Sequence, residues 1–220
     1  SGSAYNYKRQ VLLLRDGSAD LSSKILDQGI LRTSDKNSIW AKTANLIFTG
    51  KYNEALENIA KYKSDFGHFL FGPGLMPKEL MMGISYEGLG EKELAKKYYT
   101  IAKDKMEKEV QASPDDHRTH RGLGIIYSHL GLKKEAIREA KTALAILPPS
   151  KDSFFGVYQI LALAYVHMTL GDNNEALDQL ETILNKFGGI RVEHIENNPE
   201  WKQLRNHPRL VQWKENKQQT

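Results

Sequence analysis

Four glycines recur at a nearly constant interval along this chain, and this period constrains its fold more than any other feature. Gly50, Gly90, Gly131 and Gly171 are 40, 41 and 40 residues apart, and each is followed five residues later by an alanine. Self-similarity at a period of roughly 20–50 residues is typical of stacked repeats, in which each unit buries its apolar face against the next. The sequence therefore predicts a solenoid, a fold that usually presents a binding surface rather than a reaction centre.

Two of the units show how each repeat is specified. Small and aromatic residues follow one another at offsets of 3, 4, 5 and 7 residues, at Gly124, Tyr127, Gly131, Ala136 and Ala143. The same offsets recur in the preceding unit, at Gly83, Tyr86, Gly90, Ala95 and Ala102. The first glycine lets two helices approach closely, and the second ends the first helix where a positive φ is needed. The alanine five residues later is expected where the second helix crosses the first.

This pattern resembles the tetratricopeptide repeat (TPR), a helix–turn–helix unit of roughly 34 residues. The resemblance implies an all-α fold, an α-solenoid of stacked helix-turn-helix repeats with a short C-terminal helical cap. We expect a single TPR domain over residues 1–220. Its parts are degenerate N-terminal helices at 1–35, repeats at 36–66, 76–112, 117–150 and 157–188, and a cap at 192–216.

The spacing of the glycines exceeds 34 residues, and the excess is expected at different places in different units. After the first unit it forms a loop, Phe66–Pro77, whose apolar residues either tuck against the array or meet a partner. In the second unit the helix that starts at Glu91 has no breaker before about Ala112. The next helix is expected to begin with Ser113 as its N-cap and Pro114 as its first residue.

The C-terminal segment carries two proline-initiated helix starts, at Pro199 and Pro208. We expect this segment to cover the last repeat with apolar side chains, namely Trp201, Leu204, Leu210 and Trp213. A tail of this form resembles the C-terminal repeat region of bacterial signalling proteins, which include membrane-associated adenylyl cyclases, Ser/Thr protein kinases and winged-helix regulators. This resemblance implies a sensory or regulatory module.

Composition argues against several other functions. The net charge of +4 is spread through the helices without a dense basic run, so we expect no nucleic-acid partner. The longest apolar runs fall short of the roughly 18–20 residues that a membrane span needs, so no direct membrane insertion of this segment is expected. A cytoplasmic location fits, as does an extracytoplasmic one if a parent protein anchors the segment through an upstream span.

No catalytic, cofactor or metal site is expected. The chain has no cysteine, and no Ser/His/Asp set, phosphate-binding loop or paired carboxylates can be placed. His117 and His120 lie one helical turn apart beside Asp115 and Asp116, but a third ligand at helical spacing is absent. These residues are interpreted as the solvated first turn of a helix.

The TPR resemblance also implies a partner-binding groove, because in that fold the first helices of successive units line the inner face. Carried over by register, the groove residues are Trp40, Asn45, Phe48, Leu80, Ile84, Glu87, Arg118, Arg121, Ile125, His129, Tyr158, Leu161, Tyr165 and Met168. Aromatic and aliphatic residues with two arginines would suit an extended peptide, or a helix bearing an acidic group. The alternative is that the protein's own N-terminal helices or long loops fill the groove.

Some TPR proteins clamp a partner's terminal carboxylate with lysine, asparagine and arginine in this groove. Asn45 and Arg118 match that pattern, but Ala41 and Gly122 stand where a lysine and an arginine are expected. We therefore do not expect a carboxylate clamp.

Taken together, the sequence predicts a non-enzymatic protein–protein interaction module, the regulatory TPR region of a bacterial signalling protein, that binds a peptide or a neighbouring domain. The alternative is a stand-alone scaffold that self-associates, as a homodimer for example, through repeat ends or the Phe66–Pro77 loop.

Overall fold

The computed structural model describes residues 24, 36–67, 75–184 and 190–218 of the 220. Four helix pairs follow one another along the described chain, each joined by a short turn. They are α3 (Lys36–Phe48) with α4 (Tyr52–Ala60), α5 (Lys78–Gly88) with α6 (Lys92–Ala112), α7 (His117–His129) with α8 (Lys133–Ile146), and α9 (Phe155–Thr169) with α10 (Asn173–Ile183). The expected all-α solenoid is confirmed. The degenerate helices expected at 1–35 lie outside the described residues, apart from Lys24.

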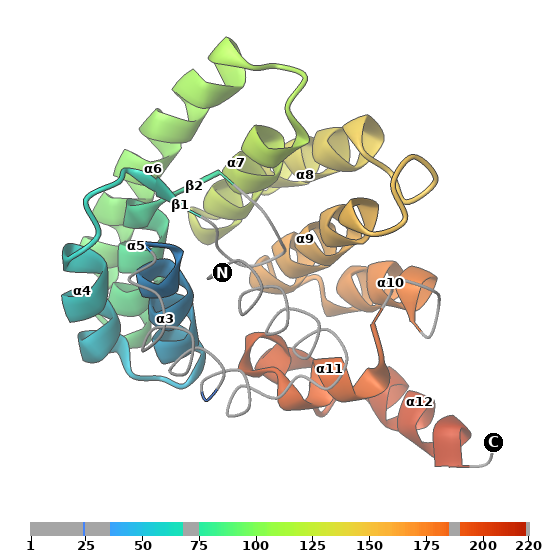
Figure 1. Cartoon of the computed structure of the whole chain (residues 1–220). Helices are drawn as coiled ribbons and strands as arrows, with labels where there is room; N and C mark the ends of the chain where they lie inside the picture. Colours follow the sequence, from blue (N-terminus) through green and yellow to red (C-terminus); the bar gives the residue numbers. More distant parts are fainter. Residues whose placement is uncertain (1–23, 25–35, 68–74, 185–189, 219–220) are drawn as a thin grey trace.

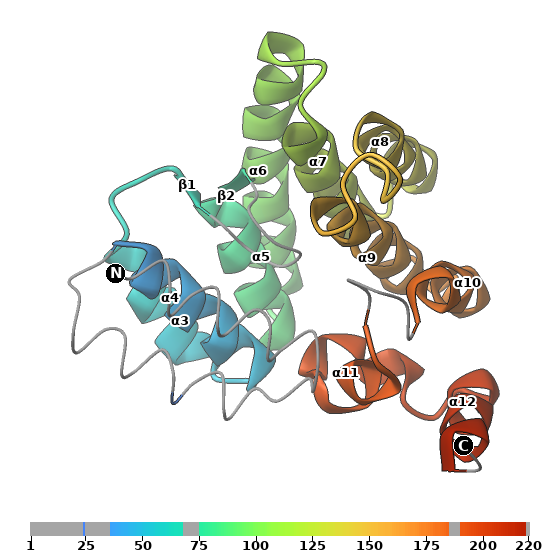
Figure 2. The same cartoon turned by 45° about the vertical axis from the view of Figure 1, so that its right-hand side comes forward.

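The helix pairs are arranged around an arc (Figure 1). The first helices, α3, α5, α7 and α9, lie on the inner side of the arc, and the second helices lie on the outer side. A view from a second direction shows the same order and the C-terminal end of α6 projecting past its neighbours (Figure 2). Among the described helices the inner helix α9 is the most enclosed, since 13 of its 15 residues are buried.

The four repeated glycines end the first helix of each pair in the left-handed conformation, as predicted. Their φ angles are 75°, 80°, 71° and 82° in chain order. At Gly131 the glycine N–H donates to the Ser128 carbonyl at 3.1 Å, and the N–H of Leu132 donates to the Tyr127 carbonyl at 3.0 Å. These two bonds form a Schellman motif, which satisfies carbonyls that the helix end leaves free.

The earlier glycine of each unit is a point of close helix approach. A Cβ added to Gly83 would lie 2.4 Å from the ring of Tyr99, and one added to Gly124 would lie 3.0 Å from the backbone of Ala140. Because no larger side chain fits there, the two helices of each pair pack very closely at these points. The sequence predicted this role for both residues.

Helix α6 runs to Ala112 as predicted, but the start of the next helix differs from the prediction. Ser113 caps the C-terminus of α6 instead of starting α7, and its N–H donates to the carbonyl of Glu109 at 2.9 Å. The N-cap of α7 is Asp116, whose Oδ1 accepts from the Arg118 N–H at 2.8 Å. A carboxylate is favoured there because it also binds the Arg118 guanidinium and lies at the positive end of the helix dipole.

The stem of the loop after the first unit is a short ribbon that the sequence did not predict. β1 (Phe66–Gly67) pairs antiparallel with β2 (Met76–Pro77), and the side chain of Met76 is completely buried. Lys105 of α6 holds the base of the ribbon, since its Nζ lies 2.8 Å from Glu79 Oε1 and 3.3 Å from Asp65 Oδ1. The stem therefore tucks against the array. The apolar residues Phe69, Leu70 and Phe71 lie outside the described residues.

The C-terminal cap consists of α11 (Val192–Asn197), the 3-10 helix η1 (Pro199–Leu204) and α12 (Pro208–Gln218). Of the four apolar residues predicted to cover the last repeat, Trp201, Leu204 and Leu210 are fully buried and Trp213 is half-buried. Arg209 fastens the cap to α10 through the carboxylates of Asp178 and Glu181, at 2.6 and 2.5 Å. The cap thus closes the end of the solenoid.

Candidate partner-binding site

Most of the side chains predicted to line the groove are not on the surface. The buried ones are Trp40, Asn45, Leu80, Arg121, Ile125, Tyr158, Leu161, Tyr165 and Met168. Phe48, Ile84 and His129 are half-buried, and only Glu87 and Arg118 are exposed. The predicted set is therefore mainly part of the core, and its role in binding a partner stays a prediction.

Two features explain why the middle of the inner face is closed. Trp40 packs edge-on against Tyr62, with ring centroids 5.1 Å apart, and beneath Gly67 of the loop stem. The other side of the stem covers Gly122 of α7, where an added Cβ would lie 3.1 Å from the carbonyl oxygen of Leu75 and 3.2 Å from the sulfur of Met76. A larger side chain at position 122 would have to displace these atoms, and the absence of a carboxylate clamp stays a prediction.

At the C-terminal ends of the inner helices, side chains bind one another across three repeats. The carboxylate of Glu87 accepts a short hydrogen bond from the Tyr99 hydroxyl and lies 3.0 Å from Nδ1 of His129. The His129 ring stacks on Tyr99 with centroids 4.7 Å apart, and its Nε2 lies 3.2 Å from the Tyr165 hydroxyl. We call Glu87, Tyr99, His129 and Tyr165 the inner network.

The cap extends the inner network, because Trp201 packs edge-on against Tyr165 with centroids 6.3 Å apart. The indole N–H of Trp201 donates to Nε2 of His194 at 3.0 Å. Burial alone would raise the pKa of the Glu87 carboxyl. The hydrogen bond and charge of His129, together with the hydrogen bond from Tyr99, outweigh burial and hold this pKa below its usual value. The network therefore keeps an ionised carboxylate fixed at this end of the inner face.

Register on the first helices placed Glu87, His129 and Tyr165 in the groove but did not place them in contact with one another. Tyr99 belongs to a second helix, where the repeat pattern assigns core residues, and Trp201 belongs to the cap. No sequence signal connects these five residues, because the contacts depend on how far each repeat rotates relative to the next.

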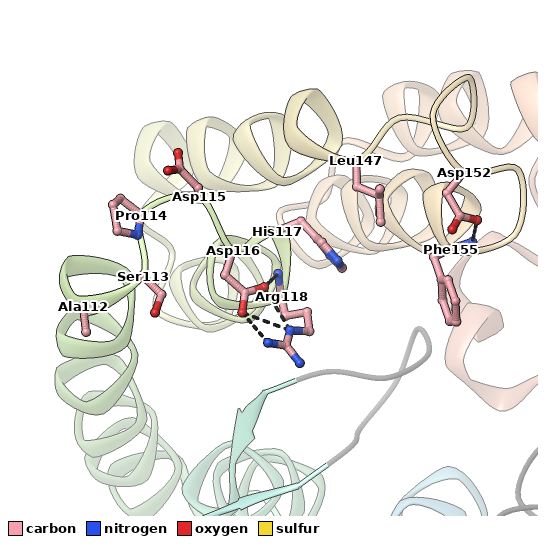
Figure 3. Close-up of a pocket in the computed structure, with 10 residues that line it drawn as sticks. All are labelled: Ala112, Ser113, Pro114, Asp115, Asp116, His117, Arg118, Leu147, Asp152 and Phe155. Atoms are coloured by element: carbon pink, nitrogen blue, oxygen red, sulfur yellow. Dashed lines mark hydrogen bonds and ion pairs between the residues drawn. The ribbon is translucent and has the colours of Figure 1, made fainter.

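A pocket opens at the opposite, N-terminal ends of α7 and α9 (Figure 3). Its volume is about 780 Å³, and it is lined by Ala112, Ser113, Pro114, Asp115, Asp116, His117, Arg118, Leu147, Asp152 and Phe155. Arg118 comes from the first turn of α7 and Phe155 from the first turn of α9, and the two side chains lie on opposite sides of the cavity. Phe155 is 39% exposed, and among the exposed large apolar residues of the described chain it is the aromatic one.

The charged groups of the pocket are held in place by hydrogen bonds. Arg118 forms a fork with Asp116, with Nε 3.0 Å from both carboxylate oxygens and Nη2 2.6 Å from Oδ2. The hydrogen bond from Arg118 lowers the pKa of Asp116. Asp152 Oδ1 accepts from the N–H groups of Phe154 and Phe155 at 2.9 and 2.8 Å, so it caps the start of α9.

His117 faces the pocket as a neutral ring. Burial, and then the charge of Arg121, lower its pKa below the usual value. Nδ1 of His117 accepts from Gln159 Nε2 at 3.1 Å, and the same amide nitrogen donates to the Phe155 carbonyl at 3.2 Å. The proton of the neutral imidazole is therefore on Nε2, which leaves a hydrogen-bond donor at this wall.

A buried contact between His120 and Glu139 supports the turn that forms one wall of the pocket. His120 Nδ1 lies 2.6 Å from Glu139 Oε2, and its Nε2 lies 2.7 Å from the Pro114 carbonyl oxygen. The ring therefore bridges Glu139 of α8 and the turn before α7. His120 is thus buried in the structure and not part of a solvated first turn as the sequence predicted, whereas His117 lines the pocket. The described part of the chain contains no group of three or more side chains suited to hold a metal ion.

Comparisons with known proteins bear on the fold. No family model matches the chain, and no curated protein sequence matches it. Among solved structures it is similar to the crystal structure of a thermophilic TPR protein of Thermus thermophilus, with a TM-score of 0.53 and 18% identity over 98% of both chains. The chain has a TPR fold. At this identity the similarity extends to the architecture alone. Separately, no helix among the described residues is long and apolar enough to cross a membrane.

Proposed function

We propose that this TPR chain is a non-enzymatic protein-interaction module that binds a peptide or a neighbouring domain at the pocket between the first turns of α7 and α9. Solenoids of stacked helices commonly bind partners on their concave surfaces. Among the predicted groove residues, Arg118 is one of the two that remain exposed, and the pocket lies directly beside it.

The observation that carries this proposal is the exposed ring of Phe155 beside a cavity of about 780 Å³. Aromatic and arginine side chains contribute most of the binding energy in many protein interfaces. Both are present here on rigid helix ends, because Asp152 caps the backbone before Phe155 and Asp116 fixes the guanidinium of Arg118. A partner side chain would meet a preformed site at little ordering cost.

The finer proposal concerns the protein to which this module belongs. The proline-initiated tail, together with the Ser113–Asp116 turn, resembles the repeat regions of bacterial signalling proteins. We propose that the chain is the sensory or regulatory portion of such a protein.

The test is capture of a partner from a lysate of the native cells. The bait is the intact chain, beside an Arg118→Ala/Phe155→Ala variant and a control, Lys134→Ala/Lys141→Ala, which removes two exposed charges from the outer helix α8. We expect the pocket variant to lose the partner and the control to keep it. A partner held equally by both variants would contradict the proposal. Capture of only further copies of the chain, with concentration-dependent sedimentation, would support the self-associating scaffold instead.

A further inference from the structure

We propose that the pocket takes a basic side chain of the partner, an arginine or a lysine that lies next to an apolar residue. This inference rests on the proposed function and specifies the chemistry of the same site. It replaces the acidic group that the sequence predicted from Arg118 and Arg121, since neither arginine presents an uncompensated positive charge to the cavity.

Arg118 and Arg121 are unsuited to bind an incoming carboxylate for different reasons. Arg118 is bound in a fork by Asp116, so an incoming carboxylate would have to displace an existing ion pair. Arg121 is 1% exposed and does not line the cavity. Burial lowers its pKa to about 10, so it remains a cation, but within the core. His117 adds no charge near neutral pH because it is held as the neutral ring.

The pocket is lined by more acidic than basic side chains, and two of its carboxylates form no ion pair among the described contacts. Three aspartates line the cavity against one arginine. Among the described contacts, Asp152 uses only Oδ1, for the cap of α9, and Asp115 makes no ion pair or side-chain hydrogen bond. Figure 3 shows Asp152 beside Phe155 and Asp115 on the opposite side of the pocket, with the Asp115 carboxylate pointing away from the side chains of Arg118 and His117. After the Arg118–Asp116 pair cancels, the lining has a net negative charge.

The apolar part of the lining suits the rest of a basic side chain. Phe155 and Leu147 form one wall, and the ring of Phe155 is exposed. The guanidinium of arginine stacks on aromatic faces, and the methylene stem of lysine or arginine packs on apolar surface while the charged head stays near carboxylates. One such side chain would use both the aspartates and the aromatic wall, whereas a carboxylate would meet repulsion from the aspartates.

The experiment uses two small probes that differ in the charge of one side chain, N-acetyl-Phe-Arg-amide and N-acetyl-Phe-Glu-amide. Each is titrated to millimolar concentration into the full ¹⁵N-labelled chain, and the backbone amide shifts are followed by NMR. We expect the arginine probe to shift the amides of residues 115–118 and 152–155 in a saturable manner, and the glutamate probe to bind at least about tenfold more weakly. Raised salt should weaken the binding of the arginine probe, since salt screens the attraction between the probe and the aspartates.

The matched variant is Asp115→Asn/Asp152→Asn, which removes two charges while the asparagine at 152 can still cap α9. We expect this variant to bind the arginine probe several-fold more weakly than the wild type. The control Glu54→Gln/Glu57→Gln removes two exposed charges from the distant helix α4 and should leave binding unchanged.

The possible results separate this inference from the proposed function. Equal or tighter binding of the glutamate probe at the same amides would overturn the basic preference and leave the pocket as a binding site. No saturable shift with either probe would also overturn the inference. Loss of the lysate partner on changing Arg118 and Phe155 tests the proposed function independently.

Discussion

The two ends of the inner face are built from the same helices and behave differently. At the C-terminal ends of α7 and α9, His129 and Tyr165 bind each other and the cap residue Trp201 lies beside them. At the N-terminal ends, Arg118 and Phe155 lie on opposite sides of a cavity. Arg118 and His129 are separated by only about 16 Å along α7, from a rise of about 1.5 Å per residue.

This difference shows that the repeat pattern positions the helices but does not decide which part of the inner face is available. Residues outside the pattern decide that. The cap and Tyr99 complete the contacts at one end, and the loop stem at Leu75 and Met76 covers the middle. At the other end the turn Ser113–Asp116 separates α6 from α7 and lines the pocket. We therefore expect changes at the closed end to alter stability, and changes at the pocket to alter binding.

The largest expected effect is at the closed end, with Trp201→Ala. Its side chain is fully buried, so the truncation should lower the free energy of unfolding by about 3–5 kcal/mol. Urea denaturation followed by circular dichroism measures this. The exposed neighbour Lys202→Ala serves as the control and should change stability by less than about 0.5 kcal/mol. A loss below about 1 kcal/mol, on the order of a surface change, would mean that the cap does not hold the closed end.

The next effect tests the middle of the inner face. Gly122→Leu forces a side chain against the Leu75 carbonyl and the Met106 methyl, which lie 3.1 and 3.0 Å from the Cβ position. Overpacking of this kind should cost about 1–3 kcal/mol in the same denaturation experiment. An unchanged midpoint would show that the loop stem is free to move away, and the middle of the groove would then count as accessible.

A smaller decrease in the free energy of unfolding is expected for Tyr99→Phe. The substitution keeps the ring stacked on His129 and removes the hydroxyl that donates to Glu87, so it should cost about 1 kcal/mol. Tyr98→Phe on the same helix is the control, since its ring stacks on Tyr86 away from the network. If the free energy of unfolding of Tyr99→Phe equals that of the wild type, the hydroxyl of Tyr99 adds nothing to the closed end.

The smallest effect concerns pH. The pKa of Glu87 is lower in the folded chain than its usual value of 4.5, so its interactions stabilise the fold above about pH 4.5. This stabilisation is lost as the pH falls through the lowered folded-state pKa, because the unfolded chain then binds the proton more readily. The difference in unfolding free energy between the wild type and Glu87→Gln should therefore shrink between neutral pH and about pH 3. If the difference in unfolding free energy between the wild type and Glu87→Gln instead grows as the pH falls, the inner network does not lower the pKa of Glu87.

Much of the fold follows from the sequence because the turn glycines and close-packed alanines are local requirements of each repeat. Gly131 must adopt a positive φ, and Gly124 must admit a neighbouring backbone, wherever the unit lies in the array. The long α6 and the capping role of Trp201 also follow from local signals, the absence of a breaker and a proline-initiated apolar tail.

The candidate site could be predicted only in part. Register placed Arg118 on the inner face, where it is exposed, but it placed Arg121 and Leu161 there as well, and both are buried. Whether an inner residue is exposed depends on the rotation between repeats and on what covers them, and neither is encoded in a single unit. The N-cap at Asp116 instead of Ser113 is a different case, because the contact of Asp116 with Arg118 is local in the sequence and the prediction did not weigh it.

The division between a closed and an open end is tested most directly by hydrogen–deuterium exchange of the intact chain with and without its captured partner. We predict that the bound partner slows exchange in segments 112–118 and 147–155, around the pocket, and leaves the C-terminal ends of α5, α7 and α9 unchanged. Slowed exchange at those C-terminal ends, with no change around the pocket, would contradict this division.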